Sequence, residues 1–446
     1  MTVITGLTRR ALLIRSAMAA VSAVGVGVTG VAEAAGLAAA GQEGSRALPP
    51  SIAALSSMRA QATPISIDER RARIERARAL MIQERIDALV LGGGTSLSYF
   101  TGARWGNSER LMALVLPVRG EAFCVVPAFE EERVREQLAR GPLATGTLRL
   151  WQEDESPFAA LAAGLKDLGT ATGRVGVEET LKFVFSDGIA SAAPALRVVS
   201  ATPVIANCRM IKSAHEIALM RLASQATLTC YEAVYKALRP GMTDGEVEGL
   251  VSAAYARLGF RGEASVQVGE YTALPHGSAT PQTIREGTII MMDDGCNVEG
   301  YLSDLTRTFV LGTPTDKMRT VFDIVSRAQA AALKAARPGL PLAGVDAAAR
   351  QVITDAGYGP GFTYFTHRLG HGIGMDMHEW PYLVPQNMFG WERDLKGRPG
   401  MTFSNEPGIY IRGGFGIRLE DDMVITESGA ELLTPPSRSL DAPFAR

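Results

Sequence analysis

The chain has 446 residues, of which 46% are hydrophobic, 7% aromatic and 21% charged, and its formal net charge at pH 7 is −2. These values are typical of a globular protein, the length favours two folded domains, and the balanced charge argues against nucleic acid as a partner. The four cysteines show no paired spacing, which argues against a disulfide framework or a structural zinc site. We expect them to be free and mostly buried.

The first 34 residues have the features of an export signal. Arg9 and Arg10 lead into a weakly apolar stretch from residue 16 to 31, and a small-residue cleavage motif ends at Ala34. This resembles a twin-arginine signal, so we expect a signal peptide over residues 1–34 and a periplasmic protein. A membrane anchor is the alternative, but Ser and Thr interrupt the apolar run, which lacks the ~20 strongly hydrophobic residues of a span.

The next part of the chain predicts a linker and then an α/β domain. Residues 35–65 are rich in Ala, Gly, Ser, Gln and Pro without a sustained period, which indicates a linker. Ser66 and Glu69 have the spacing of a capping box, so a helix should begin there. Strand-like segments follow at 88–91, 111–116, 122–126 and 175–177. Their alternation with helical stretches predicts an α/β domain over residues 66–205.

The remaining residues, 206–446, predict a second domain of the α+β class. Apolar residues recur at helical intervals in three segments, and two further blocks have the composition of strands. The helical segments are 213–238, 243–258 and 319–337, and the β-rich blocks are 266–312 and 400–428.

Ionisable residues gather in this second domain. A strand ends in Asp293 and the next carries Asp304, so a hairpin could bring the two carboxylates together. Three histidines within twelve positions and two glutamates in apolar contexts follow, namely His367, His371, His378, Glu406 and Glu420. A buried glutamate needs a cation, and a pair of hard divalent ions takes several oxygen ligands with one or two imidazoles. The pattern therefore predicts a metal site.

Several segments resemble the pita-bread metallopeptidases, especially prolidases and Xaa-Pro aminopeptidases. In chain order they are RMIKSAHEIALMR, ALPHGS, MMDDGCNVEGYLSDLTRTF, GHGIGMDMHEWP, SNEPGIY and IRLEDD. The resemblance covers roughly residues 66–430 and is closer over the second domain. It implies a creatinase-like α/β amino-terminal domain, an α+β pita-bread catalytic domain, and a homodimer or homotetramer without a stable membrane anchor.

The same resemblance implies a centre of two divalent metal ions, with Asp304 and Glu420 bridging them. The implied ligands are Asp293, Asp304, His371, Glu406 and Glu420. One imidazole among four carboxylates favours Mn²⁺, with Co²⁺ or Zn²⁺ as alternatives.

Further residues receive catalytic or binding roles from the resemblance. Glu406 would also move a proton to the leaving amine, while His276 and His378 would donate to the carbonyl or the tetrahedral intermediate. His367 and Arg418 would meet the proline or carboxylate end of the substrate. Arg418 has a second interpretation, in which it neutralises the acidic residues 420–422. Asp294, Asp376 and Glu379 are assigned to local charge or turn roles, outside the site.

We therefore expect a metal-dependent hydrolase that cleaves Xaa-Pro bonds at the N-terminus of short peptides. A prolidase that acts on Xaa-Pro dipeptides is the alternative. Hydrolysis of a non-peptide amide, a lyase reaction and an inactive binding module are other options on this fold. The five intact ligands argue against metal-free or inactive forms, and Thr366 and Met377 differ from the pattern of the lyases. The sequence does not indicate which residue is preferred before proline.

Overall fold

The computed structural model describes residues 47–386 and 394–444. The predicted signal peptide, residues 1–34, lies outside this part of the chain. Within the described residues, every helix is too short or too polar to cross a membrane. Residues from Pro49 onward form one unit, which holds two domains.

The region predicted as a linker contains ordered elements. Within 35–65 the structure has helix α2 (Pro50–Ala53) and the 3-10 helix η1 (Arg59–Gln61). Ile52 is fully buried and belongs to a core of the carboxy-terminal domain. The folded part of the chain thus begins before Ser66. The sequence did not predict this, because a helix of four residues is too short to produce a periodic pattern.

The amino-terminal domain is a mixed sheet with helices on both faces. Its strands are β1 (Ala88–Leu91), β2 (Ala113–Pro117), β3 (Phe123–Pro127), β4 (Thr147–Trp151), β5 (Gly173–Val177) and β6 (Leu196–Ser200). Its helices are α3 (Ile67–Glu84), α4 (Thr95–Thr101), η2 (Ala128–Glu130), α5 (Glu131–Leu138), α6 (Pro157–Asp167), α7 (Phe183–Ala192) and α8 (Thr202–Arg209). The predicted capping box at the start of α3 is present.

The sheet of this domain has the order β4-β3-β2-β1-β5-β6, in which β1 pairs parallel with β5 and antiparallel with β2. Alternate residues of β1 point to opposite faces. Leu89 and Leu91 pack in one core with α3 and α8, and Ala88 and Val90 pack in another with α6 and α7. A sheet covered on both faces explains why these strands read as continuous apolar runs.

In the part of the chain that the structure describes, the carboxy-terminal domain contains four α-helices and a series of short strands. Its helices are α9 (Ala214–Tyr235), α10 (Asp244–Leu258), α11 (Asp316–Ala335) and α12 (Ala343–Asp355), with the 3-10 helix η3 (Gly269–Ala273). The strands of its first half are β7 (Arg261–Gly262), β8 (Ser265–Val268), β9 (Thr288–Asp293), β10 (Cys296–Val298), β11 (Tyr301–Leu302) and β12 (Arg307–Leu311). Those of its second half are β13 (Gly370–Gly372), β14 (Glu379–Leu383), β15 (Thr402–Asn405), β16 (Gly408–Ile411), β17 (Phe415–Arg418), β18 (Asp421–Ile425) and β19 (Ala430–Leu432).

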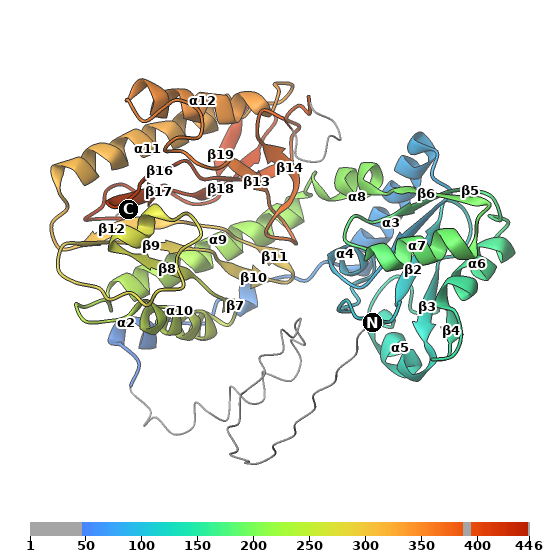
Figure 1. The fold of residues 1–446 in the computed structure, drawn as a ribbon. Coiled ribbons are helices and arrows are strands. Elements are labelled where there is room, and N and C mark those ends of the chain that lie inside the picture. The colour runs from blue at the N-terminus through green and yellow to red at the C-terminus, as the bar shows by residue number, and fades with distance from the viewer. Residues whose placement is uncertain (1–46, 387–393, 445–446) are drawn as a thin grey trace, which may run out of the picture. The chain divides into compact units, whose positions relative to one another are not determined.

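Each half of this domain pairs antiparallel strands with two helices (Figure 1). The core of α9 and α10 includes Ile290 and Met292 of β9, whereas Ile289 of the same strand belongs to the core of α11 and α12. The sheet β12-β9-β8 therefore contributes to both cores, next to the five-stranded sheet β14-β13-β15-β18-β19. The predicted α/β amino-terminal domain and α+β second domain are confirmed. All four cysteines are free and buried, as expected.

Candidate metal centre

The two predicted aspartate ligands lie at the end of the strand pair β9–β12. Asp293 is the last residue of β9, and Asp304 lies between β11 and β12. Thr306, just before β12, has its hydroxyl 2.5 Å from Asp293 Oδ1. The backbone N–H of Asp304 donates to Asp422 Oδ2 at 3.1 Å, which ties this loop to β18. The hairpin and the second sheet thus bring their acidic residues to one place.

His371 lies in β13, which runs between β14 and β15. A Cβ on Gly370 would come within 2.1 Å of Ser404 O, and one on Gly372 within 2.4 Å of Glu379 O, so only glycine fits on either side of His371. The register of β13 against β14 shifts between His371 and Gly372. Such irregularities re-aim a side chain, and here His371 points toward the acidic residues.

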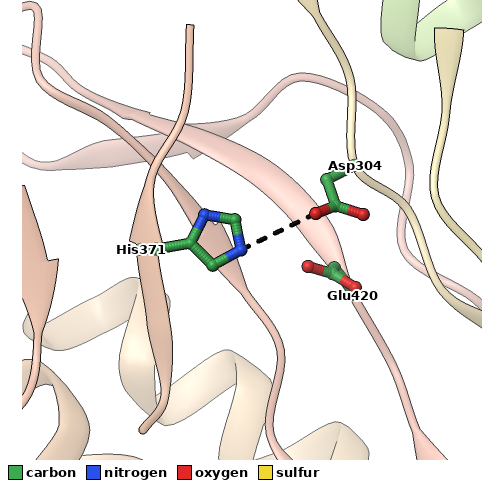
Figure 2. A group of neighbouring side chains, drawn as sticks. All are labelled: Asp304, His371 and Glu420. Carbon is green, nitrogen blue, oxygen red and sulfur yellow. Dashed lines mark ion pairs between the residues drawn. The ribbon is translucent and has the colours of Figure 1, made fainter. Parts of the chain in front are cut away.

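Three of the predicted ligands form a compact buried group (Figure 2). Each of Asp304, His371 and Glu420 offers a ligand atom, and these atoms lie within 4.8 Å of one another. His371 Nε2 is 3.6 Å from Asp304 Oδ2 and 3.4 Å from Glu406 Oε1. Glu406 directly follows β15 and Glu420 lies between β17 and β18. The distances leave space for an ion between these atoms.

The electrostatics of the group fit a cation. Burial, together with the neighbouring carboxylates, raises the pKa of Asp304 and of Glu420 well above the ordinary values. Burial also raises the pKa of Glu406, to about 7, against the opposing effect of Arg418. Crowded buried carboxylates ionise only when a positive charge compensates them. Oxygen donors with one imidazole are the donor set that divalent ions such as Mn²⁺ accept.

The imidazole of His371 is held in the form that binds a metal. Burial lowers its pKa well below the ordinary value, so the ring is neutral. Its Nδ1 lies 3.2 Å from the carbonyl oxygen of Gly372, which can only accept a hydrogen bond. The ring proton therefore belongs on Nδ1, and the lone pair of Nε2 faces Asp304 and Glu406.

Arg418 lies beneath the ligands, with 2% of its surface exposed. Its Nε donates to Thr306 Oγ1 at 2.9 Å, and its Nη1 donates to Tyr410 Oη and to Pro275 O, both at 3.0 Å. Its Nη2 donates to Asp293 Oδ2. These partners engage every nitrogen of the guanidinium, so the geometry supports a role for Arg418 in holding the ligands rather than in contacting the substrate.

Thr306 and Tyr410 belong to this site but were not predicted. The hydroxyl of Thr306 lies between Asp293 and Glu420, 2.6 Å from Glu420 Oε2, and so joins ligands from both halves of the domain. Tyr410 Oη accepts from Arg418 and lies 2.7 Å from His367 Nε2. Both residues lie inside the motifs that pointed to the site, but a neutral hydroxyl has no distinctive signal in a sequence.

The predicted ligands line a cavity of about 760 Å³, which the predicted auxiliary residues His276, His367 and His378 also line. His276 is exposed in the loop between η3 and β9, and His378 is exposed with its ring centroid 3.9 Å from that of His371. Burial, with Arg418, lowers the pKa of His367 to about 3. Both nitrogens of that neutral ring have partners, since Nδ1 lies 2.7 Å from Arg368 O. His367 thus presents mainly its ring face or edge to the cavity.

Asp294, which we assigned to a role outside the site, also lines this cavity. Its backbone has φ +107°, and its carbonyl accepts from the hydroxyl of Tyr231 at 3.0 Å. Burial, with the neighbouring Asp293, raises the pKa of its carboxyl to about 7. Asp376 and Glu379, the other two acids left out, form ion pairs with Arg209.

Comparison with known proteins gives the chain close relatives over both domains. Metallopeptidase family M24 matches residues 218–427, and the creatinase/prolidase N-terminal domain matches residues 73–211. The probable dipeptidase PepE of Mycobacterium tuberculosis is 36% identical over 363 residues, which cover 80% of this chain and 92% of PepE. The Xaa-Pro dipeptidase of Lactobacillus delbrueckii subsp. lactis is 32% identical over 368 residues, covering 80% and 94%. The crystal structure of dipeptidase PepE from Mycobacterium ulcerans has a TM-score of 0.77 at 33% identity and covers 85% of this chain and 99% of that one.

Proposed function

We propose that the chain, which belongs to metallopeptidase family M24, cleaves Xaa-Pro bonds at the N-terminus of short peptides. The observation that carries the proposal is the group of Asp304, His371 and Glu420 on a cavity of about 760 Å³. A cavity of this volume admits a small ligand, and the neutral His371 faces the carboxylates. The similarity to a named Xaa-Pro dipeptidase supports the choice of substrate.

We assign two divalent ions to this centre, with Mn²⁺ as the favoured ion. The residues that would hold them are Asp293, Asp304, His371, Glu406 and Glu420. The excess of oxygen donors supports Mn²⁺ over the softer ions. When bound, the ions supply Lewis-acid activation of the attacking water and of the scissile carbonyl.

The residues around the centre supply the proton transfers. Glu406 Oε1 accepts from Ser404 Oγ at 3.1 Å and faces His371, while Oε2 lies 3.7 Å from His367 Nδ1. The carboxyl group takes a proton from the attacking water and gives it to the leaving nitrogen. His276 and His378 border the cavity and donate to the carbonyl oxygen as it gains negative charge. Arg418 keeps Asp293 oriented during these steps.

We assign the selection of the peptide bond before proline to this cavity. An Xaa-Pro amide has no N–H, so enzymes that hold the scissile amide through that donor bind it poorly. The rings of His367 and Phe362 both border the cavity, and we assign the side with His367 to the proline ring or to the terminal carboxylate.

Hydrolysis of Ala-Pro and Ala-Pro-Ala by the Mn²⁺-loaded protein tests the proposal, with Glu406→Ala as the inactive control. Cleavage of the tripeptide supports the aminopeptidase. Cleavage of the dipeptide alone supports the second candidate, a prolidase, which the names of the dipeptidase relatives favour. If neither peptide is cleaved by protein that has bound metal, the substrate is a non-peptide amide or the reaction is that of a lyase.

Export and assembly complete the proposal. We assign residues 1–34 to a twin-arginine signal. That export route carries folded proteins, which suits this protein because metal binding is coupled to folding. Replacing Arg9 and Arg10 by lysine should retain the protein in the cytoplasm, which fractionation of cells measures. We also propose a homodimer or homotetramer, for which sedimentation gives the mass.

A further inference from the structure

The turn that carries His378 is anchored by a group of charges outside the predicted ligand set, of which only Asp376, with its side chain 38% exposed, reaches the surface. Asp376 and Glu379 stand on either side of His378 and both pair with Arg209, the last residue of α8. Lys212 also pairs with Glu379, and the side chains of these two residues are 1% and 6% exposed. Residues this deeply buried and paired hold one geometry rather than several.

Short contacts fix both sides of the turn. Arg209 Nη2 donates to Asp376 Oδ2 at 2.6 Å and to Glu379 Oε2 at 2.5 Å. Lys212 Nζ donates to Glu379 Oε1 at 2.6 Å, and the backbone N–H of Asp376 reaches Glu379 Oε2 at 3.3 Å. Burial alone would raise the pKa of Glu379, but Arg209 and Lys212 outweigh that effect and hold it at about 2. The carboxylate is therefore charged and tied to two cations.

The charged residues of this group are themselves fixed to other elements of the fold. The backbone N–H of Lys212 donates to Gly400 O at 2.9 Å, just before β15. Thr95, the first residue of α4, donates to Asp376 Oδ1 at 2.5 Å. A Cβ on Gly374 would lie 2.6 Å from Glu379 Oε1 and 2.8 Å from Lys212 Cε, so the backbone packs directly on the ion pair. The turn is thus clamped to the surrounding scaffold.

The clamp determines where the imidazole of His378 lies. The His378 side chain is exposed, and its ring centroid is 3.9 Å from that of the ligand His371. An exposed side chain has little packing of its own to fix it, so its position depends on the backbone on either side. Both flanking segments end in the carboxylates that Arg209 holds.

We infer that Arg209 is a positioning residue for catalysis, which acts through Asp376 and Glu379 to hold His378 over the metal centre. The inference rests on the proposed function, because it takes His378 to be a donor to the developing negative charge. A misplacement of about 1 Å at a catalytic group can reduce a rate by roughly 100-fold. Arg209 therefore affects the reaction although it contacts neither the substrate nor the ligands.

A double-mutant cycle on the Mn²⁺-loaded full chain tests this inference. His378→Ala should lower kcat by roughly 100-fold or more, the cost of a lost transition-state donor. Arg209→Met should lower kcat by about 10- to 100-fold with KM changed less than about threefold, since binding in the ground state is unaffected. The variant with both changes should be no slower than His378→Ala alone, within about twofold, because the arginine acts only through the histidine.

Two further variants separate positioning from general loss of structure. Arg209→Lys keeps the charge and should fold normally and recover part of kcat. Arg73→Met breaks another buried ion pair, with Glu216 at 3.0 Å, and should lower the melting temperature while its effect on kcat multiplies with that of His378→Ala. Multiplicative effects of Arg209 and His378 would overturn the inference, as would a wild-type kcat in Arg209→Met or a kcat in Arg209→Lys no higher than that of Arg209→Met. If His378→Ala itself kept full activity, the proposed donor would be wrong instead.

Discussion

Replacement of Arg307 by methionine is expected to destabilise the catalytic domain strongly. Arg307 and Asp421 form an ion pair at 2.6 Å whose side chains are both 0% exposed. Arg307 Nη1 also donates to the carbonyl oxygen of the ligand Glu420 at 2.7 Å. Methionine removes the charge, so Asp421 keeps only its neutral partners Gln329 and Thr434.

The magnitude follows from the burial of this pair. Removal of one partner from a buried ion pair costs about 3–5 kcal/mol, because the other charge stays desolvated. For a domain of 150–250 residues, each kcal/mol lowers the melting temperature by about 2–4 °C, which gives a decrease of roughly 6–20 °C. The loss of the donor to the Glu420 carbonyl should also weaken metal binding.

Scanning calorimetry of the Mn²⁺-loaded protein measures the effect against a matched control. Arg319 pairs with Asp441 at 2.9 Å, but those side chains are 43% and 45% exposed, so Arg319→Met should cost at most about 1 kcal/mol. Arg307→Met with Asp421→Leu should regain most of the lost stability, because no buried charge is left unpaired. Equal shifts in the two single variants would refute the reasoning.

Three other changes have expected outcomes. His371→Ala should lower the metal content after dialysis and reduce affinity by more than the roughly 10- to 100-fold that loss of an outer partner of a ligand costs; unchanged metal content would contradict the ligand assignment. In the metal-free protein the raised pKa values of Asp304 and Glu420 make the folded state bind extra protons, so stability falls as pH rises, and the gain in melting temperature on adding Mn²⁺ should grow as the pH rises above the ordinary carboxyl range, about pH 4. Glu379 is held at a pKa of about 2 against an ordinary 4.5, so its contribution is present above pH 4.5 and lost as pH falls toward 2. The difference in melting temperature between the wild type and Glu379→Gln should therefore shrink over that range, and a constant difference would argue against the assigned pairing.

The sequence indicated the site because its donors are ionisable groups in strand-like contexts. Asp304, His371 and Glu420 could be named because buried charges are rare in ordinary cores. The helices α9, α10 and α11 could be placed from their apolar periods, whereas α12 was missed, although its buried residues Val345, Ala349 and Ile353 recur at helical spacing. The distances between these residues could not be predicted, because they depend on how the two halves of the domain pack together.

Other features could not be predicted because they depend on tertiary contacts. The family resemblance assigned Arg418 to the substrate, with neutralisation of residues 420–422 as the alternative. Its contacts with Thr306, just before β12, and with Tyr410 of β16 depend on the packing of separate segments. Asp376 and Glu379 resembled ordinary turn residues, and only their closeness to Arg209 distinguishes them. The fold thus assigns roles that residue type alone leaves open.

The distribution of the ligands over the two halves of the catalytic domain has a thermodynamic consequence. Asp293 and Asp304 belong to the half with α9 and α10, and His371, Glu406 and Glu420 to the half with α11 and α12. Ions bound between them act as a reversible cross-link, since neither half alone offers the complete set of donors. With the ions bound, the two halves should melt as one cooperative block, and without them the block can divide along the boundary that crosses the active site.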